Sequence, residues 1–116
     1  QCACRVTQRL VVGVERHAGQ LAHLYTPKGR QTVARGRDLT ACRLLVGTGG
    51  ALTRLPGGEE MLASVRASTA GGERLLPPAD ARVALDRDYV LAACGALSTR
   101  FPADAVVALM RASLGV

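Results

Sequence analysis

The stretch Leu44-Leu45-Val46-Gly47-Thr48-Gly49-Gly50 decides how this chain folds, because an apolar run typical of a buried strand ends abruptly in a glycine turn. Glycine has no Cβ and can adopt a positive φ, so a flat ligand can lie directly against such a turn. Glycines also occur at this place simply to make a tight bend between a strand and a helix. The stretch is therefore either a ligand-contacting turn or a purely structural one.

Length and composition limit what the chain can be. Its 116 residues, 48% of them hydrophobic, suffice for a single domain over residues 1–116 with a real core, and they are too few for two domains. Aromatic residues make up only 3%, so Leu, Val and Ala must build that core. The chain begins at Gln1, without an initiator Met and inside a helical pattern that lacks a capping residue. We therefore expect a piece of a longer chain.

Charge and hydropathy exclude two kinds of partner. The sequence has no run of the ~18 to 20 apolar residues that span a bilayer, and Arg5 and Arg9 would interrupt a signal peptide. The formal net charge is +6, but the arginines are spread over every segment and aromatics for base stacking are scarce. We expect a cytoplasmic protein that contacts neither membrane nor nucleic acid.

Periodic segments alternate along the chain. Apolar residues at helical spacing predict helices over residues 2–18, 59–67, 89–97 and 102–114, and the third is apolar almost all round, which predicts burial. Two short apolar runs predict strands at 43–46 and 81–85, with a helix as the alternative for the second run. Between residues 19 and 41 the pattern is lost, with a turn at 26–29 and at most a short strand at 31–34, and residues 68–78 are a predicted loop.

This order predicts an α/β fold in which parallel strands are joined by helical crossovers. The strands around Leu45 and Val83 should then be paired or adjacent in a small sheet with helices against it. In such sheets ligands bind beyond the carboxyl ends of the strands. The glycine turn follows one predicted strand and Asp86 follows the other, so both fall on the same edge. That placement favours the ligand-contacting interpretation.

Few residues offer chemistry of their own. The acids Asp38, Asp86 and Asp88 are better explained as turn and helix-cap residues than as catalytic groups. His17 lies on the apolar stripe of the first helix, which predicts a half-buried histidine. We expect no catalysis from this chain alone and no zinc site, because the cysteines lack CxxC spacing. Reduced and mostly buried thiols are expected for all four: Cys2, Cys4, Cys42 and Cys94.

The strand and glycine turn, followed by a helix, a short strand and an Ala-rich helix, resemble the adenosine-binding half of the actin, Hsp70 and sugar-kinase ATPase superfamily, which has a ribonuclease H-like fold. More specifically, four blocks in the family's order resemble the C-terminal region of the MutL family associated with glutamate mutase, which is unrelated to the mismatch-repair protein of that name. The blocks are Arg16-His17-Ala18-Gly19, Gly36-Arg37-Asp38-Leu39-Thr40, Gly47-Thr48-Gly49-Gly50, and Asp86 with Asp88-Tyr89-Val90-Leu91 and Gly95.

The resemblance implies the C-terminal fragment of an actin-like ATPase that acts as a chaperone or reactivating factor for an adenosylcobalamin-dependent mutase such as glutamate mutase. In that superfamily the glycine turn lies against adenine and ribose, which implies Gly49 and Gly50 here, with Gly47 and Thr48 beside them. Hsp70-like members continue into Arg-Ile-Pro, whose arginine flanks adenine. The similar Arg54-Leu55-Pro56 lies one residue further from the glycines, which puts the stacking role of Arg54 in question. The implied cofactor is ATP, with the phosphate-binding hairpins and catalytic acids upstream.

A second hypothesis stays open, in which the chain is a non-catalytic interaction module whose Ala- and Leu-lined faces pack on a partner chain. Under either hypothesis, the apolar helix at 89–97 and the uncapped first helix should leave apolar surface exposed. We expect that surface to associate with mutase subunits, with the missing N-terminal part of the protein, or with a second copy as a homo-oligomer. Asp-x-Gly hairpins ahead of Gln1 in the parent would favour the ATPase hypothesis.

Overall fold

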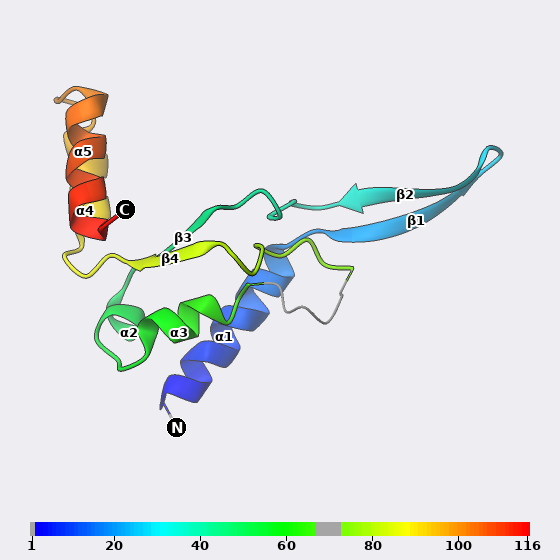
Figure 1. Cartoon of the computed structure of the whole chain (residues 1–116), viewed down its shortest axis with the longest axis horizontal. Coiled ribbons are helices and arrows are strands. Elements are labelled where there is room, and N and C mark those ends of the chain that lie inside the picture. The colour runs from blue at the N-terminus through cyan, green and yellow to red at the C-terminus, as the bar shows by residue number, and fades with distance from the viewer. Residues whose placement is uncertain (1, 67–72) are drawn as a thin grey trace.

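The computed structural model describes residues 2–66 and 73–116, and Figure 1 shows a mixed α/β chain. In chain order its elements are α1 (Cys2–His17), β1 (Gln20–Thr26), β2 (Gly29–Arg35), β3 (Leu44–Gly47), α2 (Gly50–Thr53), α3 (Gly58–Ala63), β4 (Arg82–Leu85), α4 (Val90–Leu97) and α5 (Ala103–Leu114). The predicted loop at 68–78 lies partly outside the described residues, as does the end of the helix predicted at 59–67.

The strands β3 and β4 pair in parallel, with Leu45 opposite Val83 as the sequence predicts. The chain between them contains α2 and α3, so the connection is a helical crossover. A parallel pair requires such a crossover because its two strands run the same way and a tight turn cannot join them. The prediction of a small parallel sheet with flanking helices is therefore confirmed.

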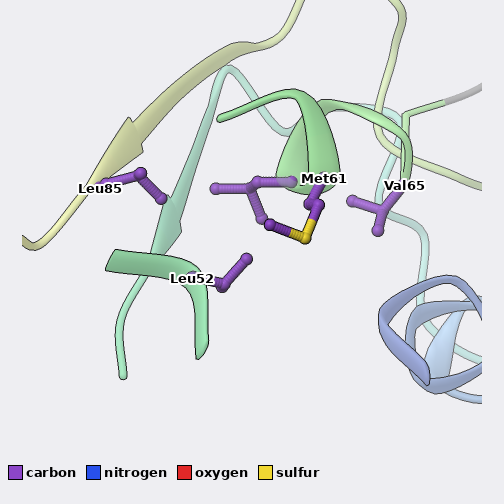
Figure 2. Close-up of a cluster of buried hydrophobic side chains, with 5 residues drawn as sticks. Leu52, Met61, Val65 and Leu85 are labelled. Atoms are coloured by element: carbon purple, nitrogen blue, oxygen red, sulfur yellow. The ribbon is translucent and has the colours of Figure 1, made fainter. Parts of the chain in front are cut away.

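The core lies between this sheet and the helices. Figure 2 shows the buried cluster Leu52, Met61, Leu62, Val65 and Leu85, which joins α2, α3 and the end of β4. The helix α1 is amphipathic, as its spacing predicts, and its half-buried side chains pack against this cluster without any residue becoming fully buried. The stripe that does so consists of Val6, Leu10, Val11 and Val14.

The strands β1 and β2 form an antiparallel hairpin that the sequence analysis missed, apart from the turn after Thr26 and a short strand at 31–34. Seven residues of each strand pair, from Gln20 opposite Arg35 to Thr26 opposite Gly29. No residue of either strand is buried. A strand with no buried face leaves no hydrophobic alternation in the sequence, so the usual signal for it was missing.

The helices α4 and α5 confirm the predicted segments, but α4 is not buried. Its one buried residue is Cys94, which faces Val106 of α5, and most of its other residues are exposed. The expectation failed because α4 packs against α5 and forms a separate arm at the end of the molecule opposite the hairpin (Figure 1). The radius of gyration is 17.5 Å, larger than the ~13 Å of a compact domain of 100 residues.

Two smaller expectations are also wrong. The thiols are free but not mostly buried, since Cys2 and Cys4 are exposed and Cys42 is half-buried. Both exposed thiols lie on the first turn of α1, outside the stripe that packs on the core. His17 is exposed because α1 contacts the core only as far as Val14, one turn earlier.

Candidate functional site

The glycine turn joins β3 to α2, and each of its glycines serves a different purpose. Gly47 is buried, and a Cβ built on it would lie 2.9 to 3.1 Å from side-chain carbons of Leu52, Leu62 and Leu85. Gly47 is therefore required by core packing. Gly49 has a φ of 93°, and a Cβ there would meet nothing within 4 Å. Only Gly49 has the positive φ that disfavours other residues.

Gly50 begins α2 without a positive φ, and a Cβ built on it would lie 3.9 Å from the Tyr89 hydroxyl. The backbone at Gly49 and Gly50 is thus uncovered and has room in front of it. This is the geometry that a flat ligand lying against the turn needs, and it is independent of any resemblance.

Thr48 and Asp86 connect the ends of the two parallel strands. The Thr48 hydroxyl donates to Asp86 Oδ2 at 3.2 Å, and the Asp86 N–H donates to the Gly47 carbonyl at 2.8 Å. The prediction that the turn and Asp86 share one edge is therefore confirmed. The role of Thr48 in this structure is to hold that edge together.

Asp86 is the most buried polar residue described, at 1% exposure, and it caps α4. Its carboxylate accepts the N–H of Val90 at 2.8 Å and that of Leu91 at 3.3 Å. A carboxylate at this position suits the positive end of a helix dipole. Asp86 is thus a capping residue, as predicted, and the alternative cap Asp88 instead accepts the Ser113 hydroxyl at 2.9 Å.

Tyr89 is a residue of this edge that sequence reasoning missed. Its hydroxyl lies 2.9 Å from the hydroxyl of Thr53 in α2, so the side chain reaches from the β4–α4 loop back to the segment that follows the glycine turn. Its φ of 53° is, among the described residues, the positive value that does not belong to a glycine. The available signals were that Tyr89 belongs to the last of the four family blocks and that it is one of two tyrosines in an aromatic-poor chain.

Arg54 is exposed at the C-terminal end of α2, beside the Tyr89 hydroxyl. The Thr53 hydroxyl, and after it the Arg54 guanidinium, lower the pKa of Tyr89 from its usual 10.0 by favouring the phenolate. The five predicted site residues lie close together in the sequence, but they have different roles in the structure. Gly47 is buried and supports the fold, Thr48 bonds to Asp86 and is itself exposed, and Gly49, Gly50 and Arg54 are at least partly accessible.

A cavity of about 530 Å³ lies against the turn. One wall is the Val6, Leu10 and Val14 stripe of α1, the other is the backbone from Thr48 to Leu52, and Arg9 contributes a charged side chain. Its size falls within the range of small-molecule sites, roughly 300 to 1,000 Å³. Another cavity, of about 660 Å³, is lined by residues 40–43, 78 and 80–82 at the amino-terminal ends of the strands. Ligands of parallel sheets bind at the other edge, which favours the cavity at the turn.

Within residues 2–66 and 73–116, no cluster of three His, Cys, Asp or Glu side chains is arranged to hold a metal ion. In the same part of the chain, no helix combines the length and apolarity that crossing a membrane requires.

Comparison with known proteins adds a family to this geometry. The family described as MutL protein matches residues 5–114. The protein called Protein MutL from Clostridium tetanomorphum is 32% identical over 95 residues, which is 82% of this chain and 20% of the relative. This chain thus spans about a fifth of the length of that relative. No solved structure matches.

Proposed function

This chain belongs to the MutL family associated with glutamate mutase, distinct from the mismatch-repair proteins of that name, and from this premise we propose that it supplies the adenosine-contacting turn of an ATP-binding protein. The full-length protein would serve an adenosylcobalamin-dependent mutase, such as glutamate mutase, as a chaperone or reactivating factor. The actin-like ATPase fold is itself part of this proposal. It rests on the resemblance of the motifs, because no solved structure matches.

One observation carries the proposal: the backbone at Gly49 and Gly50 is uncovered and borders a cavity large enough for a nucleoside. The walls of that cavity are mostly apolar, which suits the face of a purine ring and a ribose edge. Tyr89 and Arg54 lie beside the turn, and both an aromatic ring and a guanidinium can stack on a base. The phosphates and the catalytic acids would be handled by other parts of the full-length protein.

The second candidate function, a non-catalytic interaction module, is favoured by the arm of α4 and α5. Phe101, Val107 and Leu109 are between 45% and 55% exposed there, although large apolar side chains usually gain by burial. A shallow apolar hollow of about 240 Å³ lies among Leu97, Phe101 and their neighbours. These features fit packing against another protein surface, and they do not compete with a ligand at the glycine turn.

The decisive variant is Gly50→Val in the full-length protein. Because Gly50 lacks a positive φ and a Cβ built on it makes only an ordinary contact, 3.9 Å from the Tyr89 hydroxyl, valine can be accommodated by the backbone while its side chain occupies the ligand's position. Isothermal calorimetry should show that ATP and adenosine binding are abolished, while the melting temperature stays close to that of the wild type. Gly95→Val is the matched control, because a Cβ at Gly95 in α4 meets nothing within 4 Å and lies away from the turn.

Unchanged ATP affinity in a folded Gly50→Val protein would remove the adenosine role from this turn and leave the interaction module as the better function. Equal loss in Gly95→Val would show that the effect is not local to the turn.

A further inference from the structure

The hairpin of β1 and β2 projects from the rest of the molecule, as Figure 1 shows on the side opposite α4 and α5. Its base is held by the chain just before β4. The Leu21 N–H donates to the Glu73 carbonyl at 2.8 Å, and the Leu75 N–H donates to the Gly19 carbonyl at 2.7 Å. The part beyond this base, residues 24–31, we call the hairpin arm. All of its residues that belong to a strand are exposed or at most half-buried.

The arm has a defined shape despite this exposure. Two residues, Pro27 and Lys28, connect strands that remain in register to the last pair. The Thr26 hydroxyl donates to the Gly29 carbonyl at 2.9 Å across the turn, and His23 Nδ1 lies 3.1 Å from the Thr32 hydroxyl just below the arm. An isolated two-stranded hairpin is only marginally stable in water, so contact with another surface would stabilise it.

The hairpin carries charge of one sign. The stretch from Ala18 to Arg37 contains no Asp or Glu, although the whole chain has nine acidic residues. The same stretch contains four cations, which are Lys28, Arg30, Arg35 and Arg37. Among the described residues, neither Lys28 nor Arg30 forms an ion pair with an acidic side chain, and the acid at the base, Glu73, pairs instead with His23, its Oε1 lying 3.4 Å from His23 Nε2. The charge of the arm is therefore uncompensated, and an acidic surface would complement it.

The arm also presents an aromatic anchor. Tyr25 is 84% exposed and pairs across the strands with Arg30, while Leu24 is 48% exposed on the opposite face of the hairpin. Tyrosine and arginine are enriched among the residues that dominate protein–protein binding energy. Single-stranded nucleic acid instead needs several aromatic platforms for successive bases, and this arm has one.

We propose that the hairpin arm docks on an acidic surface of a protein partner, with Tyr25 as the anchor and with Lys28 and Arg30 as the charges that select the surface. This interface is separate from the glycine turn and does not depend on nucleotide binding.

The test measures fluorescence anisotropy of a labelled oligoglutamate peptide titrated with the full-length protein. The variant K28E/R30E should lower the affinity by about tenfold or more, because it places like charges opposite the peptide. The control R100E/R111E makes the same change of net charge at two exposed arginines near α5 and should change the affinity by no more than about twofold. Tyr25→Ala should weaken binding by about fivefold while the charge stays constant.

Circular dichroism should show that every variant retains its fold, since all the substituted side chains are exposed. Three outcomes overturn the proposal: no binding of the peptide, equal loss in both double variants, or tighter binding of a single-stranded oligonucleotide or of anionic phospholipid vesicles of comparable charge.

Discussion

The described residues form two sheets of two strands each, and the sheet with the shorter strands is the more deeply buried. The parallel pair β3–β4 has four residues per strand, yet it ends in buried Gly47, Ala84 and Leu85 and is covered by helices. The antiparallel pair β1–β2 has seven residues per strand and buries none of them. The comparison shows that backbone pairing and burial are separate properties, and that hydrophobic alternation in a strand follows burial rather than pairing.

The largest expected difference between the two sheets is in the unfolding free energy lost when a glycine beside each sheet is replaced by alanine. A Cβ on Gly58, at the start of α3, would overlap the backbone carbonyl oxygen of Leu52, so Gly58→Ala should cost about 3 kcal/mol or more of unfolding free energy. Gly29 in the hairpin turn has a φ of 111° but open space around it. Gly29→Ala should therefore cost only about 1 to 2 kcal/mol.

Urea denaturation monitored by circular dichroism measures both values. Equal losses in the two variants would mean that the hairpin is as tightly integrated as the parallel sheet.

A smaller difference in stability is expected when each of two aspartates that accept hydrogen bonds is replaced by alanine. Asp86→Ala removes the acceptor for the Thr48 hydroxyl and for the N–H groups of Val90 and Leu91, which should cost about 2 kcal/mol. Asp38, which follows the hairpin, accepts the Thr40 N–H and hydroxyl at an exposed site. Asp38→Ala should change stability by no more than about 0.5 kcal/mol. Thermal melting compares them, and a cost for Asp38→Ala as large as that for Asp86→Ala would contradict this assignment.

The smallest effect is a pH dependence at the edge of the parallel sheet. Since the pKa of Tyr89 is lowered from 10.0, the fold favours the phenolate. The resulting stability is present above pH ~10 and is lost as the pH falls through the lowered pKa of the folded state. Thr53→Val should raise the pKa of Tyr89 toward its ordinary value, because the Thr53 hydroxyl is the main cause of the shift.

Ultraviolet difference absorbance follows this titration in a Tyr25→Phe background, where Tyr89 is the remaining tyrosine of the chain. Thr32→Val in the hairpin is the control and should leave the titration of Tyr89 where it is. A Thr53→Val protein with an unmoved titration would assign the shift to another group.

Much of the central fold was predictable because the relevant residues are partly or fully buried. Leu45 and Val83 lie in short apolar runs, and both runs proved to be the paired strands. Pro102 and Gly115 mark the two ends of α5, where Gly115 adopts a φ of 71°. Such residues act through local backbone geometry, which a sequence records directly.

The remaining features depend on contacts between distant segments. The apolar helix α4 was expected to be buried, but whether an apolar face is covered depends on what packs against it, and here that is chiefly α5. Tyr89 acquires its position from Thr53, 36 residues earlier, through the hydrogen bond between their hydroxyls. The hairpin was missed because neither of its strands has a buried face, and even Leu24 and Tyr25 are exposed there.

The long crossover between β3 and β4 also determines the order in which the two sheets can form during synthesis. Thr48 and Asp86 are 38 residues apart, whereas His23 and Thr32 are separated by 9. On a ribosome that adds roughly 5 to 20 residues per second, the hairpin can close several seconds before β4 exists. During that interval β3 lacks its partner β4, and unpaired strand edges are sites of aggregation. A chain that stops before Arg82 would keep its hairpin and have no parallel sheet at all.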